Sequence, residues 1–276
     1  MDKIVKKLLQ IILIITIGVG STSAQEILTP ASNESPKVTN MSKREAIKLI
    51  DLAGRQRMLS QRIAKDYLYM GKNIAFDKAR KQLNESLREF RRNQGELSEM
   101  INDPELKNLM DFVNMSLDEL EKVIKKPFSL DNAQLVLDLS ESMLEGSQYI
   151  VDNIKASINV DESKIVAKSG KQRMLSQRIA KYYIAYQAGI KDKNTVEQMQ
   201  TAVKDFSSNH RELLKNSDND PKINRKLEKV DKLWKIVYKF YLNIEKGGLP
   251  FIVYTSTDDI TRMMNGVKKM YVKVYK

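Results

Sequence analysis

Apolar residues recur along most of the chain with the period of an α-helix, and the resulting helices fall into two similar sets. Side chains three and four positions apart share one face at 100° per residue, and charged positions lie between them. This pattern predicts helices over 42–70, 75–101, 104–125, 129–150, 164–186, 194–214, 222–244 and 256–276. No strand-like alternation with turn signals competes with it. The sequence therefore predicts an all-α fold of two tandem four-helix bundles.

Polar residues and prolines mark where these helices begin. Ser42 opens a capping-box pattern at the first helix. The pairs Asp103–Pro104 and Asp220–Pro221 each supply an N-cap and a first-turn proline, and they lie 117 positions apart. Ser256 with Asp259 three residues later is the expected start of the last helix.

The two sets of helices divide the chain into two domains of about 115 residues, a size that can hold its own core. We expect the first bundle over 42–157 and the second over 158–276. Because 150–165 contains neither Pro nor Gly, the last helix of the first bundle is expected to continue into the second bundle.

The helix that opens each set carries the same motif. The first copy, at 54–65, reads GRQRMLSQRIAK, and the second, at 170–181, reads GKQRMLSQRIAK. Around them, 12 of 15 positions are identical at an offset of 116. Packing requires only apolar side chains at the helical period, so the repeated polar residues need another explanation. In the first copy they are Gln56, Arg57, Ser60, Gln61 and Arg62.

One face of each motif helix places an arginine among small and apolar side chains. Arg57 shares its face with Ala53 and Ala64, and Arg173 shares the equivalent face of the second copy. Such a face predicts a seam between helices rather than an open surface. A buried guanidinium is costly without a partner, so it needs a carboxylate, a carbonyl dipole or a bound anion. The sequence is compatible with pairing inside the protein and with an external anion.

Charge and composition narrow the choice of function. The net charge is +12, and residues 41–155 hold 19 basic and 19 acidic side chains whereas 156–276 hold 24 and 13. A basic half attracts anions.

The chain has no Cys and one His, His210, which we expect on a helix surface. We therefore expect no metal site and no cofactor. Neither a Gly-rich phosphate loop nor a Ser/His/Asp set stands out, so an enzyme is not expected.

The N-terminus resembles an export signal. Residues 1–24 have a basic start, a short apolar run and a small-residue ending, which is the layout of a signal peptide cleaved after Ala24. A retained N-terminal membrane anchor is the alternative, although the run is short for a span of about 20 residues. Residues 25–41 are polar, hold two prolines and are expected to form a linker. We expect a periplasmic or secreted protein with no nucleic-acid partner.

The motif resembles the signature of the PilJ-type sensor domain, the N-terminal extracytoplasmic part of type IV pilus methyl-accepting chemotaxis transducers. It is similar, more distantly, to the periplasmic domain of NarX-type nitrate and nitrite sensor kinases, in which a Gly is followed three residues later by Arg-Met. The match covers about 15 residues in each copy. In the nitrate sensors the resemblance implies four-helix bundles that dimerise along their first helices, with the motif arginine of each partner facing one small anion. Our hypothesis is that the two tandem copies place their motifs against each other within one chain.

Carried over residue by residue, the motif arginines are Arg57 and Arg173, and the motif glycines are Gly54 and Gly170. An arginine fork suits a planar oxyanion because two parallel hydrogen bonds form with charge assistance. The expected supporting contacts are Gln56, Gln61 and Arg62 in the first copy, and Gln172, Gln177 and Arg178 in the second.

Together these patterns predict an exported, non-enzymatic sensory protein that binds a small anion through its motif arginines. Since no second apolar run of spanning length follows before Lys276, we expect it to act with a membrane-bound signalling partner. The alternative is a structural or adhesive envelope protein that docks on anionic surfaces through its basic second half, including the tail from Lys268 to Lys276.

Overall fold

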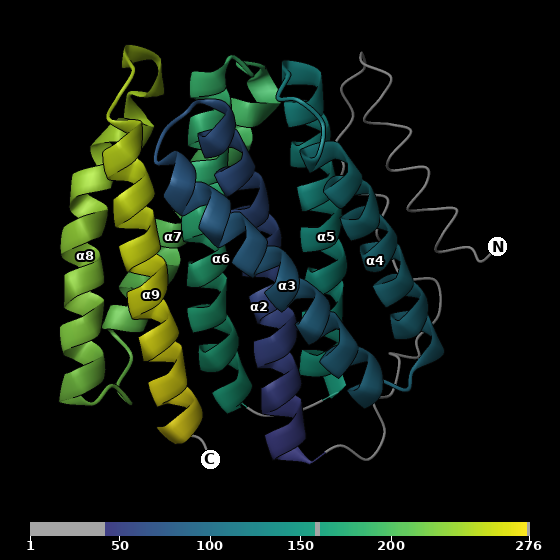
Figure 1. Cartoon of the computed structure of the whole chain (residues 1–276). Coiled ribbons are helices and arrows are strands. Elements are labelled where there is room, and N and C mark those ends of the chain that lie inside the picture. Colours follow the sequence, from purple (N-terminus) through teal and green to yellow (C-terminus); the bar gives the residue numbers. More distant parts are fainter. Residues whose placement is uncertain (1–41, 158–160, 275–276) are drawn as a thin grey trace. The chain divides into compact units, whose positions relative to one another are not determined.

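A computed structural model describes residues 42–157 and 161–274, and every regular element in these two ranges is a helix (Figure 1). The helices are α2 (Lys43–Gly71), α3 (Phe76–Met100), α4 (Pro104–Ile124), α5 (Leu130–Ser157), α6 (Asp161–Ala188), α7 (Lys193–Leu214), α8 (Pro221–Leu242) and α9 (Pro250–Val274), with a short 3-10 helix at Ile244–Lys246. The predicted all-α fold is confirmed. The expected signal peptide, the linker and the junction at 158–160 lie outside the described residues.

Most helix starts follow the capping residues that the sequence offers. The Ser42 side chain accepts a hydrogen bond from the Glu45 backbone N–H, and the Glu45 carboxylate accepts one from the Ser42 N–H, so the capping box is formed. The Asp103 and Asp220 side chains cap α4 and α8 by accepting from backbone N–H groups of the first turn, and each helix has a proline in that turn. The predicted breaks between the helices are therefore confirmed at these positions.

The start of the last helix differs from the prediction. The α9 helix begins at Pro250, so Ser256 and Asp259 lie inside it rather than at its N-terminus. Proline is well placed there because the first helical residues have no intrahelical acceptor for their N–H groups, so its missing N–H costs little. A polar pair at capping spacing was a weaker signal than the proline after Gly247 and Gly248.

Within each copy, the four helices contact one another in a ring. In the first copy α2 packs against α3 and α5, and α4 packs against α3 and α5; in the second copy α6, α7, α8 and α9 repeat this arrangement. Each ring is a four-helix bundle, with its apolar stripes turned inward.

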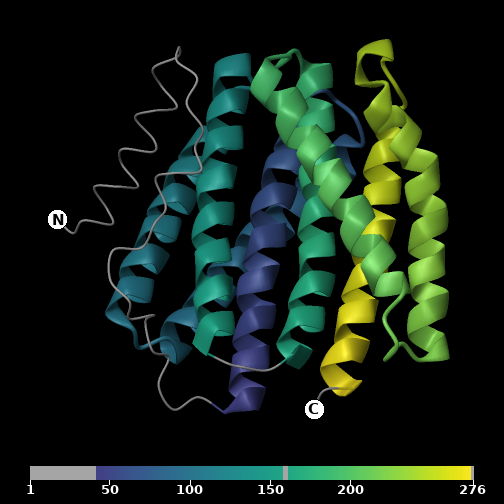
Figure 2. The same cartoon turned by 180° about the vertical axis from the view of Figure 1, so that it is seen from behind.

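The two motif helices also pack against each other. In Figures 1 and 2, α2 and α6 run side by side through the centre, with α4 and α5 on one side and α8 and α9 on the other. The described helices belong to one compact unit. Its central interface is thus made by the repeated segments, while the boundary between the two predicted domains falls at undescribed residues and stays a prediction. Within 42–157 and 161–274, no helix combines the length and apolar character needed to cross a bilayer.

Candidate functional site

Arg57 and Arg173 meet in the interface between α2 and α6. Each side chain is buried, with 2% of its surface exposed. Their Nη2 atoms converge: both lie within 4 Å of the point that a Cβ on Gly54 would occupy, and the same holds for Gly170. The predicted helix seam around the motif arginines is confirmed, and it contains both copies of the motif at one place.

The motif glycines make this approach possible. A Cβ on Gly54 would lie 3.3 Å from Arg57 Nη2 and 3.7 Å from Arg173 Nη2, and a Cβ on Gly170 would lie 3.4 Å and 3.8 Å from Arg173 and Arg57 Nη2. Contacts of 3.3–3.4 Å are tighter than a methyl group normally allows. Glycine at the start of the motif therefore lets each guanidinium lie directly over the helix backbone.

Each arginine is anchored by one amide on the last helix of its own copy. Arg57 Nη1 donates to Gln148 Oε1 on α5, and Arg173 Nη1 donates to Asn265 Oδ1 on α9 at 2.8 Å. The Nε and Nη2 atoms of Arg57 and the Nε of Arg173 have no hydrogen-bond partner within the described residues. Three buried nitrogens of the pair thus have hydrogen-bonding capacity that the protein does not use.

The positive charges disfavour each other. Burial and then the charge of Arg173 together lower the pKa of Arg57 to about 10, with Asp152 opposing them. Burial and then the charge of Arg55 together lower the pKa of Arg173 to about 9, with a smaller opposing effect of Glu89. Two guanidiniums held together away from water favour an anion between them, because negative charge relieves both the desolvation and the repulsion.

One carboxylate lies beside the pair. Asp51, one turn before Gly54 on α2, accepts a hydrogen bond from Arg173 Nη2 at 3.3 Å and forms an ion pair with Lys268 of α9. The sequence did not point to Asp51, because its counterpart is Ala167 and it lies outside the repeated segment. Lys268 was expected in an exposed basic tail. That expectation is wrong, because the side chain is turned into the interface and 1% exposed.

The motif glutamines donate hydrogen bonds to other helices of their own bundle. Gln56 Nε2 donates to Phe90 O on α3 at 3.0 Å, and Gln172 Nε2 donates to Phe206 O on α7 at 3.1 Å. Gln61 and Gln177 reach the last helices, where they donate to Ser140 O and Thr261 Oγ1. These four side chains therefore join helices, and their expected support of a ligand stays a prediction.

The second motif arginines also have partners of their own. Arg62 Nε donates to Ser86 Oγ on α3 at 2.8 Å, and Arg178 Nη2 donates to Gln198 Oε1 at 2.9 Å and pairs with Glu141. Of the ten residues predicted to form the site, the structure brings together Arg57, Arg173, Gly54 and Gly170.

His210 is buried, so its expected surface position is wrong. Its side chain is 2% exposed and stacks on Phe206, with ring centroids 5.9 Å apart at 21°. It falls at the helical period of Met199, Val203 and Phe206, the buried stripe of α7. Burial lowers its pKa, so the imidazole is neutral at physiological pH and belongs to the core.

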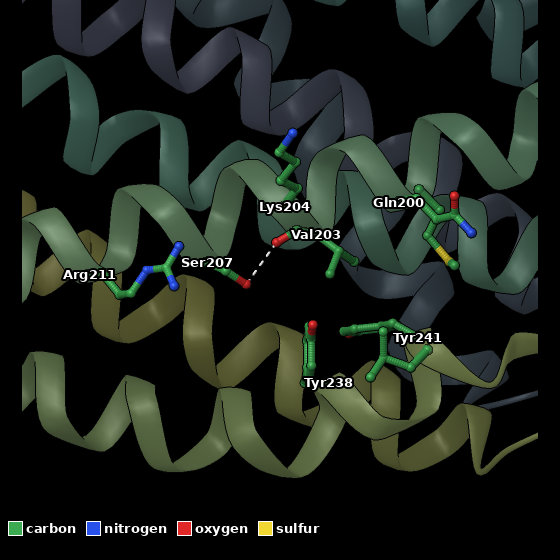
Figure 3. Close-up of a pocket in the computed structure, with 9 residues that line it drawn as sticks. Gln200, Val203, Lys204, Ser207, Arg211, Tyr238 and Tyr241 are labelled. Carbon is green, nitrogen blue, oxygen red and sulfur yellow. Dashed lines mark hydrogen bonds between the residues drawn. The ribbon is translucent and has the colours of Figure 1, made fainter.

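Two surface grooves, one in each copy, lie elsewhere. A groove of about 340 Å³ between α7 and α8 is lined by Ser207, Arg211 and Tyr238, among others (Figure 3). Ser207 Oγ is already engaged, since it donates to Val203 O and accepts from Trp234 Nε1. The equivalent groove of the first copy, between α3 and α4, is about 400 Å³. Neither groove contains a residue of the repeated motif.

Comparison with known proteins assigns the family. No curated protein and no solved structure matches the chain. A family model described as "Type IV pili methyl-accepting chemotaxis transducer N-term" matches residues 38–135 and 157–244, one segment in each copy and more than half of the chain. The PilJ resemblance is confirmed for both copies, and the more distant similarity to nitrate sensors stays an expectation. The chain belongs to the PilJ family of type IV pili methyl-accepting chemotaxis transducer N-terminal domains.

Proposed function

We propose that this protein is an exported sensor that binds one small oxyanion between Arg57 and Arg173. The family is sensory and not catalytic, which gives the chain a sensory role. An extracytoplasmic location is supported by the signal-peptide layout of residues 1–24. The bound state would pass to a membrane-bound signalling partner, as in chemotaxis transducers, of which this family forms the N-terminal part.

The observation that carries the proposal is the convergence of two buried guanidiniums with unused N–H groups. A guanidinium presents its donors as a planar fork, which matches two oxygens of a planar or tetrahedral oxyanion. Arg57 has one hydrogen-bond partner among the described residues, the neutral amide of Gln148. An oxyanion between the arginines would satisfy the open donors and neutralise charge in one step.

Internal pairing is the competing explanation, and the charges argue against it. Asp51 is the carboxylate in contact with Arg173, and it is shared with Lys268. Two buried cations, Arg173 and Lys268, thus share one acid whose side chain is 42% exposed. An arrangement made for internal neutralisation would place an acid beside Arg57 as well, as Glu89 does for Arg55.

The test is the rise in melting temperature that an added anion produces, here called the anion response. The chain from residue 25 is screened in chloride-free buffer with sodium nitrate, sulfate, phosphate and acetate, and the best anion is then titrated by calorimetry. An Arg57→Gln/Arg173→Gln variant should lose the response. A matched control, Arg80→Gln/Arg262→Gln, removes one exposed arginine from each copy and should keep it.

Comparison of the wild type with the Arg57→Gln/Arg173→Gln variant also distinguishes a loss of anion binding from a loss of folding. Removal of two repelling buried charges should leave the helical circular dichroism intact. Arg57→Lys/Arg173→Lys keeps both charges but lacks the planar fork, and it should respond weakly. An unchanged response in a folded Arg57→Gln/Arg173→Gln variant, or no response of the wild type to any anion, would refute the proposal.

A further inference from the structure

The arginine pair is symmetric, but its acidic neighbour is not. Asp51 of α2 reaches across the interface to Arg173 of α6. The position 116 residues later is Ala167, so no equivalent carboxylate on α6 reaches back to Arg57. The carboxylate that acts on Arg57 through space, Asp152, already accepts a hydrogen bond from Gln148 and pairs with Lys155.

We propose that Asp51 is an internal counter-anion that occupies the Arg173 side of the anion site and that a bound oxyanion must displace. This inference rests on the proposed function. It assigns Asp51 the role of setting the affinity of the site, which is distinct from the role of the two arginines in contacting the anion.

The different solvent exposure of Asp51 and of the two cations that it pairs with allows an oxyanion to replace it. The Asp51 side chain is 42% exposed, whereas the side chains of Arg173 and Lys268, with which it pairs, are each 2% exposed. The carboxylate therefore lies at the rim and the cations lie inside. Because the Asp51 side chain is already half exposed, rotation about its side-chain bonds is enough to move the carboxylate into water, and the helices need not move. The carboxylate regains its full hydration there.

The charge balance gives the direction of the effect. With Asp51 in place, one carboxylate pairs with Arg173 and Lys268; without it, Arg173 loses that counterion while its guanidinium still lies next to that of Arg57. Loss of Asp51 should therefore lower the stability of the empty protein and raise its affinity for an anion. A residue that only holds helices together would not produce these opposite changes, since its loss would weaken folding and binding in the same direction.

The experiment uses a pair of variants related by the internal repeat. Asp51→Asn removes the counter-anion, and Ala167→Asp introduces one at the equivalent position beside Arg57. Sodium sulfate and sodium nitrate serve as probes, in calorimetry and thermal unfolding. We expect Asp51→Asn to bind about tenfold tighter than the wild type and to melt at a lower temperature without anion. We expect Ala167→Asp to bind about tenfold weaker.

A third variant covers the case in which Ala167→Asp does not fold, since Ala167 is buried. Lys268→Met removes the cation that shares Asp51, so the carboxylate is held more strongly by Arg173 and anion binding should weaken. An anion affinity of Asp51→Asn equal to or below that of the wild type would overturn the inference. The proposed function would survive that result if Arg57→Gln/Arg173→Gln still abolished the response. If neither wild type nor Asp51→Asn responds to either probe, both proposals fail.

Discussion

Lys65 Nζ lies 2.8 Å from Asp258 Oδ1, so a lysine in the first motif copy is paired with an acid on the last helix of the second copy. The reciprocal pair joins Lys181 of the second copy to Glu141 on α5 of the first. Both lysine side chains are fully buried. The lysine that ends the motif is thereby explained, because each copy supplies the counterion for the other.

These crossed pairs should contribute strongly to stability. Asp258→Asn leaves the buried Lys65 with Asp66 and Gln82, and we expect the free energy of unfolding to fall by about 2 kcal/mol. Glu141→Gln should cost about 3 kcal/mol, because Glu141 is paired with Arg178 as well as Lys181. Urea denaturation measures both. Asp77→Asn, in an exposed pair with Arg80, is the control and should change stability by less than about 0.5 kcal/mol.

The same pairs should make the two copies unfold together. Trp234, the one tryptophan of the chain, lies on α8 in the second copy, so its fluorescence reports that copy, whereas far-ultraviolet circular dichroism reports all helices. We expect the two signals to give one coincident urea transition for the wild type. In an Asp258→Asn/Glu141→Gln variant the transitions should separate. Separate transitions in the wild type would show that the copies fold independently.

The sequence was sufficient to predict the helices and the seam, because both depend on local signals. Helical period, capping residues and prolines place α2, α4 and α8, and the repeat identifies the arginines that meet. Asp51 and Lys268 could not be predicted in this way. Their contact joins the first helix of one copy to the last helix of the other, and neither residue is repeated.

Repetition leaves two interpretations of the motif glutamines open. A polar residue that recurs on an apolar stripe suggests a ligand contact, but Gln56 and Gln172 each donate to a backbone carbonyl at the same place in the two bundles. A glutamine that joins two helices in both copies is repeated in the sequence just as a glutamine that binds a ligand in both copies would be. Only the position of the acceptor in space distinguishes the two.

Gln56→Leu tests that distinction. It removes the donor to Phe90 O in a buried position, and we expect a loss of about 1–2 kcal/mol in unfolding free energy. The anion response should remain, because the Gln56 side chain donates to α3, whereas the arginine pair lies in the interface between α2 and α6. If Gln56→Leu instead lost the anion response while its free energy of unfolding stayed unchanged, Gln56 would be a ligand contact.

Asp66 should make stability depend on pH. It is fully buried beside Lys65, and burial raises its pKa to about 7, with Lys65 and Arg62 opposing and Asp258 adding to the rise. The folded state therefore holds a proton that the unfolded state releases near pH 4, so stability should fall as the pH rises from about 4 to about 7 and then level off. Asp66→Asn should remove this fall and gain about 4 kcal/mol at pH 8.

Chemical denaturation at intervals between pH 4 and pH 8 measures this dependence. The second copy supports the expectation, since Tyr182 stands at the position of Asp66 and the helix there needs no acid. Parallel pH profiles of the wild type and Asp66→Asn would mean that the carboxyl ionises normally in the folded protein.

Gly54→Ala should separate the geometry of the anion site from the stability of its helix. Alanine favours a helix interior over glycine by about 1 kcal/mol, so the fold should not suffer. The new methyl group would lie 3.3 Å from Arg57 Nη2 and displace the guanidinium, so anion affinity should fall about tenfold. Gly95→Ala on α3 is the matched control, since a Cβ there meets nothing within 4 Å. It should raise the melting temperature and leave the anion response unchanged. If Gly54→Ala instead behaves as Gly95→Ala does in both measurements, the close approach of the arginines over the motif glycines has no part in binding.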